Sequence, residues 1–599
     1  MFKKLVLISA VFFMTACLFA SEKLILVNST TYEGLTYTKK YLESNGIWVK
    51  HIYPPSVMIV DEKNTEGIQP VRGITGIYTG KVESSVISSL TGSAKYGVLA
   101  WNEGLEISRK APVAPVPLPS YYFDGSDCLF APGDTLQNYR SPAFLGKVLP
   151  EPPTSLTTGY LIGSTAICLV FPQCNGSKEA TVHTWTESEI TTYTNTYKNE
   201  MNKFATAEPN AHISFIYEIK TISVDWEPAN YGSNDIDIEI AGINKWFPQV
   251  LTSLGVSTDY FGGPNEYSNI LRASYKTDWA YMDIEISTAG SSSGGGRSFA
   301  YFGRFTFNYN HMAGAHEAVH IYYGQDEYNT GTNSALYTSG YYATPNTNYL
   351  GAGGEPNCIM ITGSGTTFCT YTRQQLGWVD ANANGIMDLL EVKPSGSVTL
   401  GSKILTGVAM AGTPVCASST RGPNMTFTIK DISSVAYSVD GGDWVPATAK
   451  DGVFNSAYEP YSFYPTAEHE ASTHTLDIRF MESMGLSTTI STTVGTLDLL
   501  TSVNSAVCYP TPFNPRDPGS RLKIATGAVN QSFTVAIYNT AGEKIKTLSQ
   551  LGTEIDTETG FATWDGKNTA GEEVATGMYF VVATSGTKSA KGKLLVKKK

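Results

Sequence analysis

The spacing of apolar residues changes along the chain. From residue 121 to 392, stretches with apolar residues at every third or fourth position alternate with short continuous apolar runs, which predicts alternating helices and strands. The clearest helix begins after Thr186, whose hydroxyl would form a capping box with Glu189, and it keeps apolar residues on one face from Ile190 to Phe204. Strands are expected at 165–171, 213–219, 279–286 and 299–309, with a further helix near 246–254.

After residue 392 the helical spacing disappears. Short runs of alternating apolar and polar residues are separated by turn sequences such as Asp-Gly-Gly-Asp at 440–443. This pattern predicts two β-sandwiches, at 393–504 and 505–599. The expected fold class is therefore multidomain, with an α/β domain at 121–392 followed by two Ig-like β-sandwich domains.

A smaller α/β pattern occupies residues 21–109 and is followed by a proline-rich linker at 110–120. Its position ahead of a larger domain is typical of a propeptide, and an N-terminal binding module is the alternative. The sequence leaves open whether this unit is removed. Its expected elements are a strand at 24–27, helices at 32–44 and 81–91, and extended chain at 46–59.

The first twenty residues have the features of a signal peptide. Lys3 and Lys4 precede a short apolar stretch at 5–16, and Ala20 offers a small residue at a cleavage site. The stretch is too short to span a bilayer stably. We therefore expect a protein that is secreted or held at the cell surface. The segment that ends at Cys17 loosely resembles a bacterial lipoprotein box, so a lipid on Cys17 is an alternative.

Composition narrows the class of partner. The net charge is -12 and no basic stripe occurs outside the extreme C-terminus, which argues against a nucleic-acid partner. The 8 cysteines suit an oxidising compartment, in which close pairs form local disulfides. The expected pairs are Cys168/Cys174 and Cys358/Cys369, while the partners of Cys128, Cys416 and Cys508 stay open.

The segment from His316 to His320 reads His-Glu-Ala-Val-His. Two histidines four residues apart on a helix lie about 40° apart around its axis, so both imidazoles face one point. A catalytic zinc ion needs such a pair, a third protein ligand and an open position for water. Glu317 lies on the adjacent face, where its carboxylate would act as the general base toward that water. A turn at Gly324 would fold Asp326 back toward the metal.

The stretch from His316 to Asp326 resembles the extended motif of metzincin-type proteases, in the variant of the snapalysin-like group whose third ligand is aspartate. The resemblance implies an α/β zincin domain that holds Zn²⁺ with His316, His320 and Asp326. The family's glycine is expected seven residues after the first histidine, where this chain has Tyr323. This departure leaves Glu327 as a rival third ligand.

Metzincins also carry a methionine on a turn beneath the metal, and the segment Asn357-Cys358-Ile359-Met360 resembles that turn. The resemblance implies that Met360 packs below the ligands without a chemical role of its own. A disulfide between Cys358 and Cys369 would hold the loop in place. The alternative is that Met360 is an ordinary core residue.

A second metal loop is expected where residues 380–391 match the twelve-residue calcium loop of EF-hands, with Gly385 at the sixth position. Two neutral asparagines in the ligand set suit weak binding at extracellular calcium levels. The loop would connect the protease domain to the following sandwich, and an Asn- and Gly-rich turn without an ion is the alternative. The expected Ca²⁺ ligands are Asp380, Asn382, Asn384, Ile386, Asp388 and Glu391.

Residues 509–599 resemble the Ig-like sorting modules of the flagellar hook-capping and type IX secretion kind, found at the ends of secreted bacterial proteins. The resemblance implies export across an outer membrane and attachment to the cell surface. A plain stability domain is the alternative. The matching segments are 512–515, 537–543, 564–568, 577–580 and the basic tail at 597–599.

Together these features predict a secreted zinc endopeptidase, a monomer that cleaves peptide bonds of extracellular proteins or peptides. One alternative is a surface adhesin or binding protein that retains a silent zincin domain. The intact Glu317 argues against a catalytically inactive domain, because a pure binding domain has no need of a general base. A zinc hydrolase acting on a non-peptide ester or amide is the third possibility.

Overall fold

A computed structural model describes most of the chain as two compact units, the first formed by the described residues up to 387 with 416–425, and the second by 388–415 and 426–598. The expected signal peptide with Cys17 and the expected linker at 110–120 lie outside the described residues. The described residues are 22–61, 73–109, 128–129, 156–180, 182–228, 242–287, 298–309, 314–327, 337–347, 357–362, 365–399, 405–463, 465, 473–495, 506–517, 520–528, 532–548, 554–557 and 560–598.

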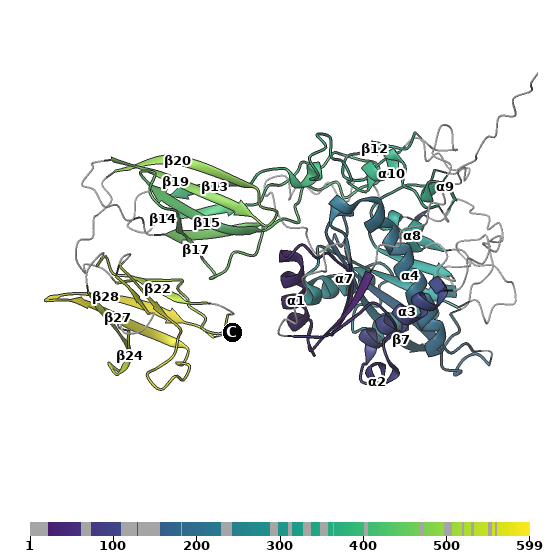
Figure 1. Cartoon of the computed structure of the whole chain (residues 1–599), viewed down its shortest axis with the longest axis horizontal. Helices are drawn as coiled ribbons and strands as arrows, with labels where there is room; N and C mark the ends of the chain where they lie inside the picture. Colours follow the sequence, from purple (N-terminus) through teal and green to yellow (C-terminus); the bar gives the residue numbers. More distant parts are fainter. Residues whose placement is uncertain are drawn as a thin grey trace, which may run out of the picture. The chain divides into compact units, whose positions relative to one another are not determined.

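One ten-stranded sheet forms the centre of the first unit, in the order β4-β1-β3-β2-β7-β6-β8-β10-β9-β5 (Figure 1). The five strands from β2 to β10 in that order run parallel to one another, an arrangement that buries a strand on both faces. The strands are β1 (Glu22–Val27), β2 (Val49–Tyr53), β3 (Val57–Asp61), β4 (Ile74–Tyr78), β5 (Cys128–Leu129), β6 (Ser164–Cys174), β7 (Ser214–Val224), β8 (Trp279–Ile286), β9 (Phe299–Tyr301) and β10 (Phe305–Tyr309), with a separate hairpin of β11 (Thr338–Ser339) and β12 (Thr344–Pro345).

Helices cover both faces of this sheet. On one face Leu35, Phe247 and Leu271 of three helices share a core with Met282 of β8. The residue before it on the strand, Tyr281, points to the opposite face, where its hydroxyl lies 2.9 Å from that of Tyr197 in α4. The helices are α1 (Tyr32–Ser44), α2 (Ser84–Ile87), α3 (Gly92–Arg109), α4 (Glu187–Ala207), α6 (Phe247–Ser253), α7 (Gly262–Tyr275), α8 (Gly314–Ile321), α9 (Ile359–Thr362) and α10 (Thr370–Gln375), with a 3-10 turn η3 (Pro209–Ala211).

The strongest helix of the sequence pattern is confirmed as α4. The Thr186 hydroxyl accepts the Glu189 N–H at 3.2 Å, and the Glu189 carboxylate accepts the Thr186 N–H at 2.8 Å, which together form the expected capping box. The expected strands at 165–171, 213–219 and 279–286 correspond to β6, β7 and β8. Local patterning therefore located the central elements of the sheet correctly.

The expectation of a separate N-terminal unit at 21–109 is wrong. Strand β2 pairs in parallel with β7 through His51 and Phe215, so the N-terminal strands extend the central sheet. Their apolar residues, such as Val49 and Met58, belong to the same core as Phe247. The sequence suggested a boundary because the proline-rich stretch interrupts the chain, but partners in a parallel sheet can be far apart in sequence.

Two further local predictions are wrong. The helix expected at 81–91 is only the short α2, and the long helix is α3, whose Gly97 packs against Tyr53 so closely that an added Cβ would lie 2.4 Å from the ring. The strand expected at 299–309 is a hairpin of β9 and β10 that turns at Gly303, where φ is +65°. In both cases a glycine needed for a close approach or a turn interrupted or hid the pattern.

The second unit contains two pairs of four-stranded antiparallel sheets, in the stretches where two sandwiches were expected. Each pair encloses a core of its own, with residues from both sheets. The first pair comprises β13 (Ser395–Thr399), β14 (Leu405–Met410), β17 (Thr448–Ala449) and β18 (Tyr458–Phe463), and β15 (Ile432–Val439), β16 (Val445–Pro446), β19 (Thr473–Glu482) and β20 (Ser487–Gly495). The second comprises β21 (Val507–Tyr509), β22 (Leu522–Ala525), β25 (Ile555–Asp556) and β26 (Phe561–Trp564), and β23 (Thr534–Asn539), β24 (Lys544–Leu548), β27 (Gly577–Ser585) and β28 (Lys588–Val596).

The connection between β14 and β15 corrects the expected boundary at 393. Residues 416–425 belong to the first unit. There the Ala417 N–H donates to the Tyr341 carbonyl at 3.0 Å, and the Arg421 N–H donates to the Thr338 carbonyl at 3.0 Å. The chain therefore enters the first sandwich, returns to the first unit and enters the sandwich again.

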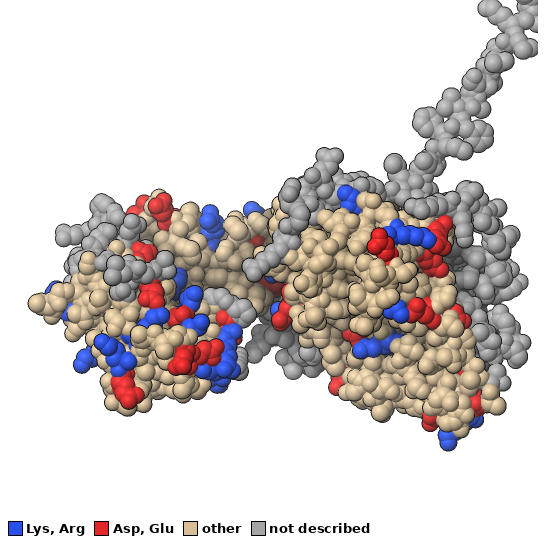
Figure 2. Space-filling view, turned by 60° about the horizontal axis from the view of Figure 1, so that its bottom comes forward, with Lys and Arg blue, Asp and Glu red and all other residues tan. Residues whose placement is uncertain are grey.

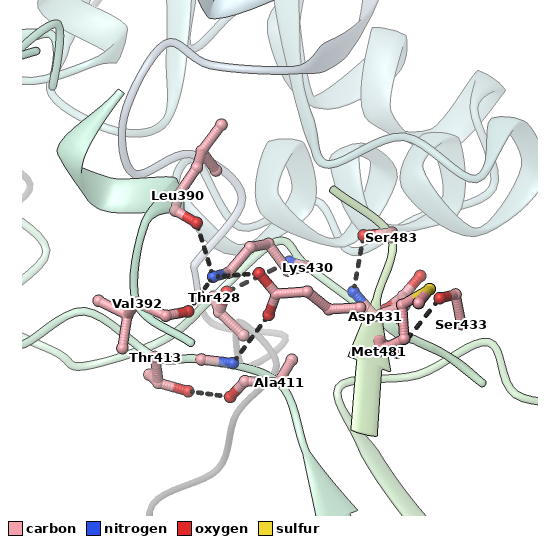
Figure 3. Close-up of polar contacts among 12 residues, drawn as sticks. Leu390, Val392, Ala411, Thr413, Thr428, Lys430, Asp431, Ser433, Met481 and Ser483 are labelled. Carbon is pink, nitrogen blue, oxygen red and sulfur yellow. Dashed lines mark hydrogen bonds and ion pairs between the residues drawn. The ribbon is translucent and has the colours of Figure 1, made fainter. Parts of the chain in front are cut away.

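A buried ion pair fixes the entry to the first sandwich (Figure 3). Lys430 Nζ lies 2.8 Å from Glu482 Oε1, and both side chains are fully buried. The same ammonium group donates to the carbonyls of Leu390 and Val392, while Glu482 accepts the Gly412 N–H at 3.2 Å. Leu390 ends a 3-10 turn, η6 (Asp388–Leu390). The pair thus ties the chain before β13 to strand β19.

Charged residues are sparse on the face drawn in Figure 2, where blue and red side chains are interspersed among tan ones. Among the described residues, no helix combines the length and apolarity needed to cross a membrane.

The expected Cys168/Cys174 disulfide is wrong. Both cysteines lie on β6, where six residues of extended chain span about 20 Å, whereas disulfide-bonded Cα atoms lie within about 7 Å. The described part of the chain contains no disulfide bond. Cys358 and Cys369 do lie close together, and their environment is described below.

Candidate metal centre

Helix α8 presents two imidazoles to one point. All eight of its residues are buried, and the helix packs between α4 and strands β9 and β10. The Nε2 atoms of His316 and His320 lie 3.2 Å apart, and the two rings are nearly perpendicular. The structure therefore brings the two histidines together as their four-residue spacing predicted.

Backbone carbonyls determine which nitrogen of each ring carries a proton. His316 Nδ1 lies 2.9 Å from the Ile359 carbonyl oxygen, and His320 Nδ1 lies 2.8 Å from the Gly324 carbonyl oxygen. A carbonyl oxygen only accepts, so each Nδ1 is the donor, and a neutral ring keeps its lone pair on Nε2. Such second hydrogen bonds orient the histidine ligands of metal sites.

Asp326 supplies the third atom that could bind a metal ion. Its Oδ1 lies 3.1 Å from His316 Nε2 and 3.3 Å from His320 Nε2, and the side chain is only 5% exposed. The turn that returns it to the histidines has its left-handed residue at Tyr323, with φ at +67°. Gly324 is needed for a different reason, because an added Cβ would lie 2.1 Å from Val319 Cγ1.

The carboxylate of Asp326 attracts positive charge to the two imidazoles. Burial opposes a positive His316, but the hydrogen bond and the charge of Asp326, with that of Glu317, raise the pKa of His316 to about 9. Burial also opposes the ionised form of Asp326, yet the two histidines hold the pKa of that carboxyl well below its usual range. The site therefore favours bound positive charge.

The donor spacing fits a tetrahedral zinc ion. Ligands about 2 Å from a tetrahedral zinc lie about 3.3 Å from one another. The three distances among His316 Nε2, His320 Nε2 and Asp326 Oδ1 are 3.1, 3.2 and 3.3 Å. Two imidazoles and one carboxylate also form a donor set used by catalytic zinc sites, which keep a further position open.

Glu317 lies beside these donors on α8 and is fully buried. Its negative charge contributes to the raised pKa of its neighbour His316. The structure therefore places the Glu317 carboxylate beside the histidine cluster, and its role as a general base stays a prediction.

The loop at 357–360 supports this centre through its backbone. The Ile359 carbonyl accepts the His316 Nδ1–H, and the Met360 carbonyl accepts the Glu327 N–H at 2.9 Å. The Met360 side chain is fully buried. The expected methionine loop is therefore next to the histidines, although its thioether as a packing surface below a metal stays a prediction.

Glu327, the rival third ligand, has different partners. Its Oε1 accepts hydrogen bonds from the Cys369 thiol at 2.8 Å and the Thr372 hydroxyl at 3.2 Å. Burial, together with Cys369, raises the pKa of Glu327 to about 8. With Cys358 and Cys369, Glu327 forms a second cluster, distinct from that of the histidines. Sequence reasoning missed this cluster because it assigned the two cysteines to a disulfide.

The expected calcium loop folds as a compact turn. Asp380 accepts the Asn384 N–H at 3.1 Å and the Gly385 N–H at 2.8 Å, and Gly385 has the positive φ of +84° expected at the sixth position. The side chains of Asn382 and Asn384 accept the N–H groups of Asn384 and Ile386, respectively. The backbone carbonyl of Asp388 accepts the Glu391 N–H. A calcium loop and an ion-free turn would share these bonds, so calcium binding stays a prediction.

Sequence reasoning missed two buried carboxyl groups on β8. Asp283 and Glu285 are fully buried, and Asp283 accepts hydrogen bonds from Thr306 and Asn308 at 2.7 and 2.6 Å. Burial raises the pKa of Asp283 to about 7 and that of Glu285 well above its usual range. The available signal was the acidic residue at alternate positions of an otherwise apolar strand.

Comparisons with known proteins give little further information. No family model matches the chain, and no curated protein matches it. Dimeric latent PorU from Porphyromonas gingivalis is 14% identical over 34% of this chain and 20% of its own, with a TM-score of 0.20. PorZ, a surface component of the type IX secretion system of the same organism, is 21% identical over 20% of this chain and 15% of its own, with a TM-score of 0.14. Similarity this low carries no argument about function.

Proposed function

We propose that this chain is a secreted zinc-dependent endopeptidase. The observation that carries the proposal is the cluster of His316 Nε2, His320 Nε2 and Asp326 Oδ1, in which the three donors lie 3.1 to 3.3 Å from one another. Zinc would be held by these three residues. When bound, it would supply Lewis acidity toward water and toward the scissile carbonyl.

The chain's own residues would do the remaining chemistry. Glu317 would take the proton of the attacking water and later give it to the leaving amine. The carbonyls of Ile359 and Gly324 would hold a proton on Nδ1 of each imidazole and so leave Nε2 as the atom that binds the metal. Burial of the cluster excludes bulk water and so strengthens each electrostatic interaction within it.

A comparison of Glu317→Gln with the unchanged chain tests this proposal. We expect Glu317→Gln to keep its zinc and to lose about 10²- to 10⁴-fold in cleavage of an unfolded protein substrate. An exposed glutamate of α1 provides the matched control, because Glu33→Gln should retain both zinc and activity. Peptide cleavage by Glu317→Gln at the unchanged rate would contradict the assignment of the base. A zinc-loaded wild type that cleaves no peptide bond would instead favour the binding-protein alternative.

The third ligand is tested separately. Asp326→Asn keeps the size of the side chain but removes its charge, so we expect zinc affinity to fall by at least tenfold and activity to fall with it. Zinc affinity measured with a competing chelator reports this directly. Unchanged affinity in Asp326→Asn would exclude Asp326 from the ligand set.

We also propose that the protein is exported and that the sandwich at 506–598 directs its sorting to the medium or the cell surface. The support is the sequence resemblance of this sandwich together with its separate core. Deletion of 506–599 should leave the product inside the producing cell envelope. Release of the shortened chain at the normal level would show that the sandwich serves stability alone.

A further inference from the structure

A second group of metal-binding side chains lies next to the histidine cluster. Glu327, Cys358 and Cys369 come from three separate segments, yet their donor atoms lie within 4.8 Å of one another. Glu327 and Cys358 are 0% exposed and Cys369 is 1% exposed. From these contacts we infer that Glu327, Cys358 and Cys369 form a second metal site, for a thiophilic divalent ion such as zinc.

The donor types favour such an ion. Thiolates are soft ligands that select zinc and its softer neighbours over calcium or magnesium, and structural zinc sites commonly combine several cysteines. The Thr372 hydroxyl lies 3.5 Å from Cys358 Sγ, 3.4 Å from Cys369 Sγ and 3.2 Å from Glu327 Oε1. This hydroxyl therefore contacts all three side chains of the cluster.

Backbone N–H groups are aimed at both sulfurs. The Cys369 N–H donates to Cys358 Sγ at 3.4 Å, and the Thr372 N–H donates to Cys369 Sγ at 3.4 Å. Hydrogen bonds to sulfur stabilise the thiolate, which is the form that binds metals. Binding of a divalent ion would displace the thiol protons to solvent, so no oxidant or reductant is needed.

The second carboxylate oxygen of Glu327 gives an independent argument for a bound cation. Within the described residues its Oε2 has no hydrogen-bond partner, although no solvent reaches it. A buried carboxylate oxygen without a partner is costly. A metal ion between Glu327 and the two sulfurs would remove this cost, whereas a Cys358–Cys369 disulfide would take away one of the carboxylate's two hydrogen-bond donors.

The two clusters are linked through the backbone. Glu327 follows Asp326 directly, and Cys358 precedes Ile359, whose carbonyl orients His316. The Glu327 N–H also donates to the Met360 carbonyl. An ion in the cysteine site would therefore hold in place the loop that orients the histidine site. We expect its loss to weaken zinc binding at the histidines by about 10- to 100-fold.

Cobalt substitution tests the second site without any variant. The full chain is purified under reducing conditions, stripped with chelator and titrated with Co²⁺. Of the two clusters found among the described residues, the cysteine site alone contains sulfur, so it should give the near-ultraviolet charge-transfer band of cobalt–thiolate bonds. We expect that band and two tightly bound equivalents. No thiolate band in the reduced, folded protein would overturn the inference.

Variants separate this inference from the peptidase proposal. In Cys358→Ser/Cys369→Ser the thiolate band should vanish and the metal content fall from two equivalents to one, while Cys508→Ser, a buried cysteine of the last sandwich, should keep both. The band should survive in His316→Ala/His320→Ala, which lacks the histidine site. A Cys358–Cys369 disulfide in protein isolated without reductant, read from its peptide masses, would also overturn the inference. The thiolate band is independent of catalytic activity.

Discussion

At the scale of single residues, the candidate centre depends on groups that the motif does not contain. The motif supplies His316, Glu317 and His320, but the carbonyls of Ile359 and Gly324 determine the protonation of the rings. Of two adjacent acids, Asp326 lies against the histidines and Glu327 against two cysteines. The sequence resemblance favoured Asp326 over Glu327, and the turn at Tyr323 brings the Asp326 side chain to the histidines.

His51 makes stability depend on pH. Burial, then the charge of Lys198, lowers the pKa of His51 to about 3, while its ring bonds Asn202 and Tyr217. A histidine with a lowered folded pKa stabilises the fold above its unfolded value of 6.5 and loses that contribution as the pH falls toward 3. Between pH 7 and 5 we expect the free energy of unfolding to fall by about 2 kcal/mol more in the wild type than in His51→Gln.

Urea unfolding at the two pH values measures this difference. The exposed His212 lies in a left-handed conformation that asparagine tolerates, so His212→Asn is the matched control and should keep the wild-type dependence. Equal losses in wild type and His51→Gln would mean that His51 is not the group that titrates.

At the scale of elements, glycines and buried pairs decide where segments meet. Repeating apolar positions identified α4, β6, β7 and β8, because each buries a regular stripe or run. The same pattern did not identify α3, where Gly97 packs closely against Tyr53, or the β9–β10 hairpin, which turns at Gly303. The spacing of Cys358 and Cys369 also indicated that these residues lie close together. It could not indicate that Glu327, from a distant segment, lies beside them.

Gly324→Ala should disturb the histidine centre. Its Cβ would overlap Val319 Cγ1 at 2.1 Å, so the turn must shift and carry the carbonyl that orients His320. We expect a loss of about 1–3 kcal/mol in unfolding free energy and weaker zinc binding. Gly80→Ala, where nothing lies within 4 Å of the added carbon, should change neither. Wild-type zinc affinity in Gly324→Ala would argue that the turn is adaptable.

Lys430→Ala should destabilise the first sandwich strongly. It would leave Glu482 buried without its cation and two carbonyls without their donor, at a cost of about 3–5 kcal/mol. Arg516→Ala removes a solvent-exposed partner of Glu573 and should cost less than about 1 kcal/mol. Thermal unfolding measures both. Similar small losses would show that Lys430 is hydrated in solution.

At the scale of the whole molecule, the chain combines one large mixed unit with two independent sandwich cores. The alternation after residue 392 predicted the sandwiches, because strands such as β18 and β23 bury alternate residues. The union of residues 22–61 with the central sheet could not be predicted, since nothing local specifies that β2 pairs with β7. Zinc binding and peptidase activity remain predictions with the tests described above, and calcium binding at 380–391 remains a prediction.

Two deletions should therefore behave differently. Without residues 22–109 the edge of β7 and one side of the core lose their cover, so we expect an insoluble or unfolded product. Without 506–599 the remaining chain keeps its cores, and its melting temperature should change by only a few degrees. Circular dichroism with thermal melts compares the two. A soluble, active product of the first deletion would restore the propeptide interpretation.

The parallel pairing of β2 with β7 also governs the order in which the protein can mature. His51 bonds Tyr217 across a sequence separation of 166 residues, so β2, although it pairs with the nearby β3, has no partner on its other edge until much later in synthesis. Pairings this distant form slowly, because a long loop must close before any contact is gained. Until that pairing forms, the central sheet is incomplete, and a chain without its folded core can still thread through a narrow export channel.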